Sequence, residues 1–163
     1  QPDGLEVEET GTTFAANARI KALAVAKATG HWALADDSGL SVTALNGAPG
    51  VHSARYAPTD PERIQKLLAA LLNCPQRGAY FSAALCVAAP DGQVLLEVEG
   101  RCEGQITKVP RGDQGFGYDP IFEVNTTGRT FAEMPLSEKK SHGHRGRAFS
   151  LLEPLLQRLI SVN

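Results

Sequence analysis

The sequence has few cysteines and no excess of charge of either sign. Its three cysteines, Cys74, Cys86 and Cys102, are an odd number and form no C-x-x-C pair. This pattern argues against a disulfide framework or a zinc site and favours a reducing compartment. The 16 lysines and arginines nearly balance the 18 aspartates and glutamates. The whole molecule therefore lacks the basic surface of a non-specific nucleic-acid binder, and we expect no nucleic-acid partner.

Long apolar runs are also absent. No segment approaches the roughly 20 apolar residues that span a membrane, and residues 1–4 have no signal-peptide character. At 163 residues, of which 42% are hydrophobic, the chain has the size and composition of one globular domain. We therefore predict a cytoplasmic protein without a membrane partner, with residues 1–163 forming a single domain.

Two common catalytic signatures are missing as well. The sequence contains no G-x-x-x-x-G-K-[ST], which excludes a P-loop protein. It contains no G-x-S-x-G and no cysteine convincingly paired with a histidine, which argues against acyl-transfer chemistry.

The periodicity of the chain predicts an α/β fold with a mixed sheet. Thr12 or Thr13 can cap a helix that runs through Thr29 and is closed by Gly30. Thr59 and Glu62 form the signature of a second helix start. Predicted strands lie at residues 5–8, 32–35, 40–45, 80–89 and 94–106, the last two joined by a hairpin at residues 91–92, and a helix interrupted by Pro154 begins near His144.

Three segments could carry chemistry, and the first is residues 34–40. There an apolar run stops at Asp36 and Asp37, and two adjacent carboxylates repel one another unless a cation compensates them. Glu9 is a possible third carboxylate, and such oxygen donors suit Mg²⁺, which completes its shell with water and substrate phosphate. The alternative is an ordinary surface turn, because Asp, Ser and Gly all favour turns.

The second segment, residues 115–120, places Phe116 between two glycines. Glycines let the backbone approach a ligand closely and leave the ring free to stack on a flat group. A hairpin turn with core aromatics explains the same pattern equally well.

The third segment, residues 139–147, gathers six basic or titratable side chains in nine positions, at the start of a predicted helix. Helix N-termini favour anions, so this segment could bind phosphates. The alternatives are a solvated charge run or a nuclear-targeting or nucleic-acid patch. Together the three segments suit a nucleoside triphosphate with Mg²⁺, and metal-assisted hydrolysis of a phosphoanhydride is the natural reaction.

Six motifs in order carry a family resemblance that spans residues 9 to about 148. They are Glu9-Thr10-Gly11, Asn17-Ala18 with Lys21-Ala22, residues 35–40, residues 47–56, residues 115–120, and Ser137-Glu138-Lys139 with residues 144–148. The chain resembles the inosine triphosphate pyrophosphatase (Ham1/RdgB-like) family. The resemblance implies a two-lobed fold with an elongated mixed sheet flanked by helices, and Mg²⁺-dependent hydrolysis of dITP, ITP and XTP to the monophosphate and pyrophosphate. It also implies a homodimer.

The resemblance further implies roles for individual residues. Asp37 would be the proton acceptor and a metal ligand, with Glu9 and Asp36 assisting at the metal. The substrate-binding residues would be Ser38, Lys21, Phe116, Gly117, Tyr118, Asp119, Lys139, His144 and Arg145, of which His144 and Arg145 would favour a 6-oxo purine.

The chain departs from the family at its start. Members open with a strand and a lysine-containing loop that grips the triphosphate, and no such segment is found here, so we expect an N-terminally truncated domain whose first strand is absent. One alternative is therefore a nucleotide-binding protein with weak or no catalysis. Another is a Maf-like pyrophosphatase with a different base preference.

Overall fold

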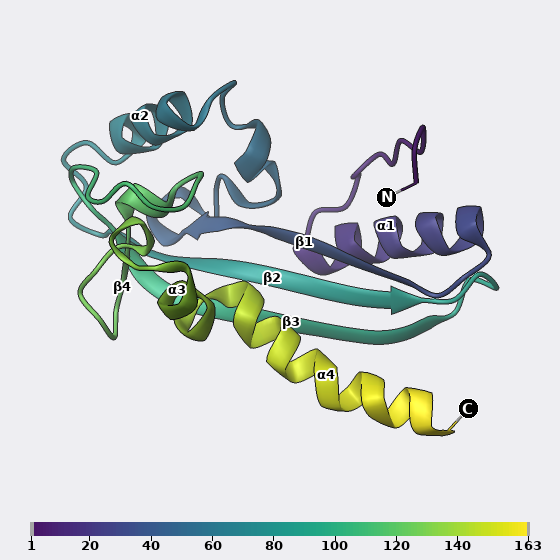
Figure 1. Cartoon of the computed structure of the whole chain (residues 1–163). Helices are drawn as coiled ribbons and strands as arrows, with labels where there is room; N and C mark the ends of the chain where they lie inside the picture. Colours follow the sequence, from purple (N-terminus) through teal and green to yellow (C-terminus); the bar gives the residue numbers. More distant parts are fainter. Residues whose placement is uncertain (1, 163) are drawn as a thin grey trace.

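A four-stranded antiparallel sheet forms the centre of the computed structural model, which describes residues 2–162 (Figure 1). The strand order is β1-β2-β3-β4, and every pairing among the described strands is antiparallel. The prediction of a mixed sheet is therefore wrong for this part of the chain, while the α/β class and the hairpin between β2 and β3 are confirmed. The strands are β1 (Ala33–Val42), β2 (Gly78–Ala88), β3 (Val94–Ile106) and β4 (Phe122–Val124).

Helices cover both faces of the sheet. Helix α1 (Phe14–Thr29) packs on one face and α4 (His144–Val162) on the other (Figure 1). Residues 43–77, which we call the α2 lobe, stand at one end of the sheet and carry α2 (Asp60–Ala70) and the 3₁₀-helix η2 (Gly50–Arg55). The remaining elements are η1 (Thr43–Leu45), η3 (Asp119–Ile121), η4 (Phe131–Glu133) and α3 (Leu136–His142).

Local sequence signals explain the ends of α1. The Thr13 hydroxyl accepts a hydrogen bond from the amide of Ala16 at 3.1 Å, which satisfies a donor that the helix itself leaves free. At the other end Gly30 has φ +70°, and its N–H donates to the carbonyl of Ala26 at 2.9 Å. Both predicted helix limits are confirmed.

The acidic segment is part of a continuous strand. Residues 36 and 37, which fall between the strands predicted at 32–35 and 40–45, lie within β1 and pair with Leu85 and Ala84 of β2. The long apolar β2 supplies backbone partners along the whole length of β1, and this pairing outweighs the local turn preference of Asp and Ser. The predicted strand at residues 40–45 ends at Val42, and residues 5–8 form no strand.

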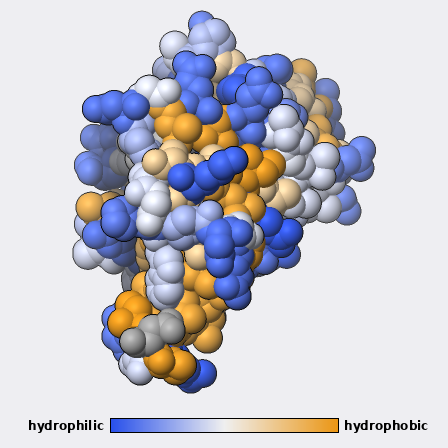
Figure 2. Space-filling model, turned by 90° about the vertical axis from the view of Figure 1, so that its right-hand side faces the viewer, coloured by the Kyte–Doolittle hydropathy of each residue, from blue (hydrophilic) through white to orange (hydrophobic). Residues whose placement is uncertain are grey.

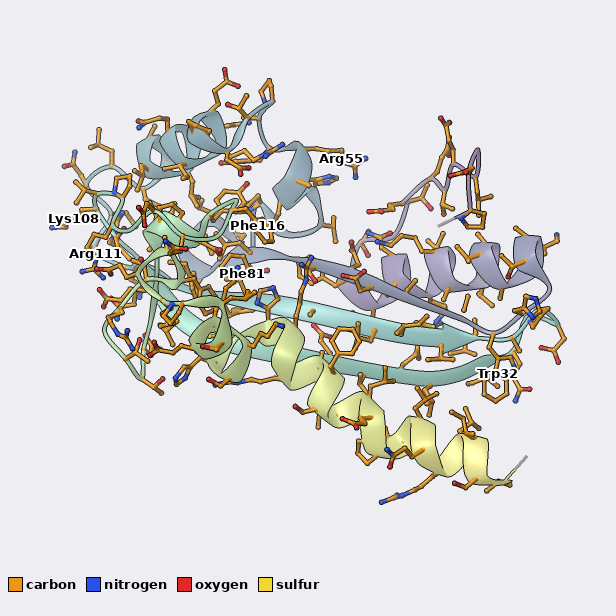
Figure 3. All side chains as sticks on the ribbon, in the orientation of Figure 1. Trp32, Arg55, Phe81, Lys108, Arg111 and Phe116 are labelled. Atoms are coloured by element: carbon orange, nitrogen blue, oxygen red, sulfur yellow. The ribbon has the colours of Figure 1, made fainter. Side chains whose placement is uncertain are left out.

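The end of the sheet that carries Trp32 lies opposite the α2 lobe (Figure 3). Apolar side chains gather over the middle of the surface at that end, bordered by polar ones (Figure 2). Trp32 itself is 44% exposed, so the single tryptophan is not part of the core. The largest core cluster lies instead at the α2 lobe end, where Leu40, Leu67, Phe81, Phe122 and Phe131 pack together.

Helix α4 contacts the sheet at Gly100, with no side chain between them. A Cβ atom added at Gly100 would lie less than 3.0 Å from the amide nitrogen of Ala148 and the carbonyl oxygen of His144. We expect Gly100→Ala to lower the free energy of unfolding by about 2–3 kcal/mol, because helix and strand backbones must separate. Urea denaturation measures this change.

Gly78→Ala is the matched control, since this β2 glycine has only the Thr43 hydroxyl near an added Cβ, at 4.0 Å. Its expected change lies within about 0.5 kcal/mol. Equal losses from the two substitutions would contradict direct backbone packing at Gly100.

Candidate active site

A cavity of about 600 Å³ lies where the α2 lobe meets the sheet and the start of α4. Figure 3 shows Phe81 and Phe116 at this junction, far from Trp32. The cavity collects most of the predicted substrate-binding residues, although they come from distant parts of the chain. These are Ser38, Phe116, Gly117, Tyr118, Asp119, Lys139, His144 and Arg145.

Asp119 and Lys139 form an ion pair beside the cavity. Lys139 Nζ lies 2.6 Å from Asp119 Oδ2, which also accepts a hydrogen bond from the amide of Phe116 at 3.1 Å. Asp119 is only 3% exposed, and this burial raises the pKa of its carboxyl, while Lys139 acts in the opposite direction. The pair thus holds the turn that carries Phe116.

That turn depends on Gly115. This residue has φ +75°, and a Cβ atom there would collide with the Asp119 carboxylate. Glycine therefore serves two purposes, because it adopts the left-handed conformation and leaves room for Asp119.

The ring of Phe116 is open to the cavity. The residue is 62% exposed, with Lys139 Nζ at 4.5 Å and the Arg145 guanidinium carbon at 5.9 Å from the ring centroid. An exposed aromatic face bordered by cations suits a planar, electron-rich group. Tyr118 differs, because it is buried and its hydroxyl donates to the carbonyl of Ser53 at 2.7 Å.

His144 is a neutral imidazole at the inner wall of the cavity. Its ring stacks on Phe81, with centroids 4.8 Å apart and an interplanar angle of 13°. Burial, together with the nearby cations Arg145 and Lys139, lowers the pKa of His144 to about 3. Nδ1 is buried and has no hydrogen-bond partner. The ring can therefore offer one donor and one acceptor to a ligand at neutral pH.

Asp37, Glu9 and Lys21 form a second cluster, on the α1 side of β1. Lys21 Nζ lies 3.3 Å from Glu9 Oε1 and 3.4 Å from Asp37 Oδ1, so one ammonium group contacts both carboxylates and can balance the charge of only one of them. Burial raises the pKa of Asp37, Lys21 lowers it and Glu9 raises it. Asp37 Oδ2 is buried without a partner. Lys21, one of the predicted substrate-binding residues, therefore contacts Glu9 and Asp37 in this structure.

This cluster fits a Mg²⁺ ion in its donor chemistry. The described residues contain no group of three or more histidine, cysteine, aspartate or glutamate side chains arranged to hold a metal. Mg²⁺ needs fewer, because one or two carboxylates, water and substrate phosphate complete its shell. The unpartnered Asp37 Oδ2 and the adjacent Glu9 supply two such carboxylates.

Asp36 does not join the other two predicted metal ligands. Successive strand residues point to opposite faces of a sheet, so Asp36 faces away from Asp37 and Glu9. Its side chain is 51% exposed, and Oδ2 lies 3.7 Å from Arg145 Nη2. The prediction that Asp36 assists Asp37 at one metal is therefore corrected by the alternation along β1.

The two parts of the site meet at the edge of the sheet. Ser38 lines the cavity on one face of β1, whereas its neighbour Asp37 lies on the other face. Among the described strands β1 pairs only with β2, and on its other edge the described residues form one isolated bridge, between Ser41 and Pro49. A ligand held in the cavity can extend past this edge toward Asp37.

Sequence reasoning missed residues of the α2 lobe and of α1. Ser53, Asp60 and Arg63 line the cavity, but the Thr59-Asp60-Pro61-Glu62 segment had been interpreted only as a helix start. Asn17 is fully buried and accepts a hydrogen bond from the Gly11 amide at 2.7 Å, which fixes the segment next to Glu9. In the sequence Asn17 stood only within a family motif, and it was given no role.

Comparisons with known proteins are consistent with this site. The model of the Ham1 family matches residues 1–155. A protein of Parasynechococcus marenigrum named dITP/XTP pyrophosphatase is 77% identical over 99% of this chain and 83% of its own length. A protein of the same name from Synechococcus sp. is 68% identical over 98% of this chain and 78% of its length. The structure of a HAM1 protein from Coxiella burnetii, 48% identical, superposes with a TM-score of 0.91 over 94% of this chain and 81% of that one.

Proposed function

The chain belongs to the Ham1 family, and from this premise we propose that it hydrolyses deaminated purine nucleoside triphosphates. The substrates would be dITP, ITP and XTP, the products the monophosphate and pyrophosphate, and the required ion Mg²⁺. The main support is the placement of the aromatic cavity and the Glu9–Asp37 pair on either side of one strand edge. A cytoplasmic location and a homodimer belong to the same proposal. No helix in residues 2–162 is long and apolar enough to cross a membrane.

Asp37 would accept the proton of the attacking water. Burial raises the pKa of this carboxyl, which makes it a stronger base than an exposed aspartate. Glu9 and Asp37 would hold Mg²⁺, which when bound polarises phosphoryl oxygens and lowers the pKa of water. Lys21, which contacts both carboxylates, can turn its ammonium to phosphate oxygens.

The cavity would recognise the base. Phe116 offers a stacking surface, and the neutral His144 and the cation Arg145 offer donors that suit the O6 acceptor of a 6-oxo purine. Adenine has a donor at that position, so its complex would leave the donor of the buried His144 without a partner. Sites built to pair a specific polar group reject the analogue that lacks it strongly.

Pyrophosphate release from dITP and from dATP, each with Mg²⁺, tests the proposal. We expect kcat/KM for dITP to exceed that for dATP by at least about 100-fold, because the wrong base leaves unpaired donors. Phosphorus NMR distinguishes pyrophosphate from orthophosphate as the product. Equal turnover of the two nucleotides, or release of orthophosphate, would refute the proposal.

A further inference from the structure

The Phe116 turn is tied to the α2 lobe by one side chain that the proposed function does not use. Asp60, in the first turn of α2, accepts a hydrogen bond from the amide of Gly117 at 2.8 Å through Oδ2. Its second oxygen, Oδ1, lies 2.5 Å from Arg63 Nη1. The two ends of this link are 57 residues apart in the chain, and both line the cavity.

The two consecutive amides of the turn are held from opposite sides. The amide of Phe116 donates to Asp119, which is paired with Lys139 next to the sheet. The amide of Gly117 donates to Asp60 in the α2 lobe. Because the Phe116 ring is mostly exposed, its own packing does little to fix its position. These two hydrogen bonds hold the turn, together with the one that the Asp119 amide donates to the Phe116 carbonyl at 3.2 Å.

Arg63 keeps Asp60 in place. The arginine is the third residue after Asp60 on the same helix, a spacing that brings the two side chains together. Its Nη2 also reaches the carbonyl of Pro58 at 3.5 Å, and its side chain is largely buried while that of Asp60 is exposed. A carboxylate held by a buried guanidinium has little freedom to leave the Gly117 amide.

We propose that Asp60, oriented by Arg63, is a positioning residue that sets the Phe116 platform for the base. This inference rests on the proposed function and deepens it. Asp60 acts through Gly117, remote from the carboxylates that surround the reacting phosphates. The platform is used equally by the bound substrate and the transition state, so the loss of its position affects KM and leaves kcat nearly unchanged.

The test compares Asp60→Ala and Asp60→Asn with Glu62→Ala, a matched control that removes an exposed acid from the same helix turn. Asp60→Ala should raise KM for dITP roughly tenfold, the scale of one lost hydrogen bond to a charged group, with kcat within about twofold. Asp60→Asn should lie between this variant and the wild type, because its amide oxygen still accepts from Gly117. Glu62→Ala should match the wild type.

Two further measurements separate positioning from general loosening. The first is inhibition by inorganic tripolyphosphate with Mg²⁺. Tripolyphosphate has no base, so its Ki should not change in Asp60→Ala. Hydrogen exchange of residues 115–118, measured without nucleotide, should accelerate in Asp60→Ala and remain unchanged in Glu62→Ala. An unchanged KM, an unchanged exchange rate, or a parallel rise of KM and Ki would each overturn the inference. A wild-type chain without activity on dITP would refute the proposed function, while the exchange experiment still decides whether Asp60 holds the turn.

Discussion

Asp37→Asn should lower pyrophosphate release from dITP by at least about 100-fold, the scale on which a positioned general base contributes. Asparagine keeps the shape of the side chain but accepts no proton and is a poorer ligand for a divalent cation. The substitution should not unfold the protein. Burial raises the pKa of Asp37, which means that the fold already disfavours its charge at neutral pH.

Asp36→Asn is the matched control for this experiment. It removes the neighbouring carboxylate, which lies on the opposite face of β1 and meets only the rim of the cavity through Arg145. We expect a change of no more than about fivefold, the size of a weak exposed ion pair. Steady-state kinetics with dITP and Mg²⁺ measure both variants. If Asp36→Asn is the more damaging substitution, the assignment of Asp37 as the proton acceptor is wrong.

Lys139→Met should lower the free energy of unfolding by about 3–5 kcal/mol at neutral pH, because it leaves the Asp119 carboxylate buried without its cation. Methionine has a similar length, so most of the loss is electrostatic. The adjacent Lys140→Met, at an exposed position, should change stability by less than about 0.5 kcal/mol. Urea denaturation of the two variants measures the difference.

The loss of unfolding free energy caused by Lys139→Met should become smaller as the pH falls. Burial raises the pKa of Asp119 above its ordinary value, and removal of Lys139 raises this pKa further. Between the unfolded pKa of about 3.9 and the raised folded pKa, the folded state binds more protons than the unfolded state. The stability of the variant therefore falls as the pH rises through this range and recovers as the pH falls toward the unfolded pKa. The double variant Lys139→Met with Asp119→Asn has no such carboxylate and should lack this pH dependence. A loss that is independent of pH would contradict the electrostatic explanation.

The contents of the site were more predictable than its geometry. Phe116, Lys139, His144 and Arg145 were assigned from motifs of the family, and the structure gathers them around one cavity. The prediction that Asp36 assists Asp37 at a metal came from their adjacency in the sequence and from the resemblance, and neither indicates that the two residues lie in one strand. In a turn adjacent side chains can converge, whereas in a strand they diverge.

Asp60 illustrates the limit of local signals. Its sequence context predicts a helix start, and α2 does begin there, with the Thr59 hydroxyl accepting from the Glu62 amide at 3.4 Å. The same context contains no information about Gly117, because a contact across 57 residues depends on how the α2 lobe packs against the sheet.

The sequence alone determined a helix start at Thr12 or Thr13, the helix limits at Gly30 and Thr59, the β2–β3 hairpin and a set of candidate site residues, since capping groups, turn residues and motifs act over a few neighbouring positions. The tertiary structure decided the rest. Pairing with β2 extended β1 through the two aspartates and so separated Asp36 from Asp37. Packing of the α2 lobe and of α4 then brought residues from five distant segments to one cavity. These outcomes depend on backbone hydrogen bonds and close packing between segments far apart in the chain, which no local pattern specifies.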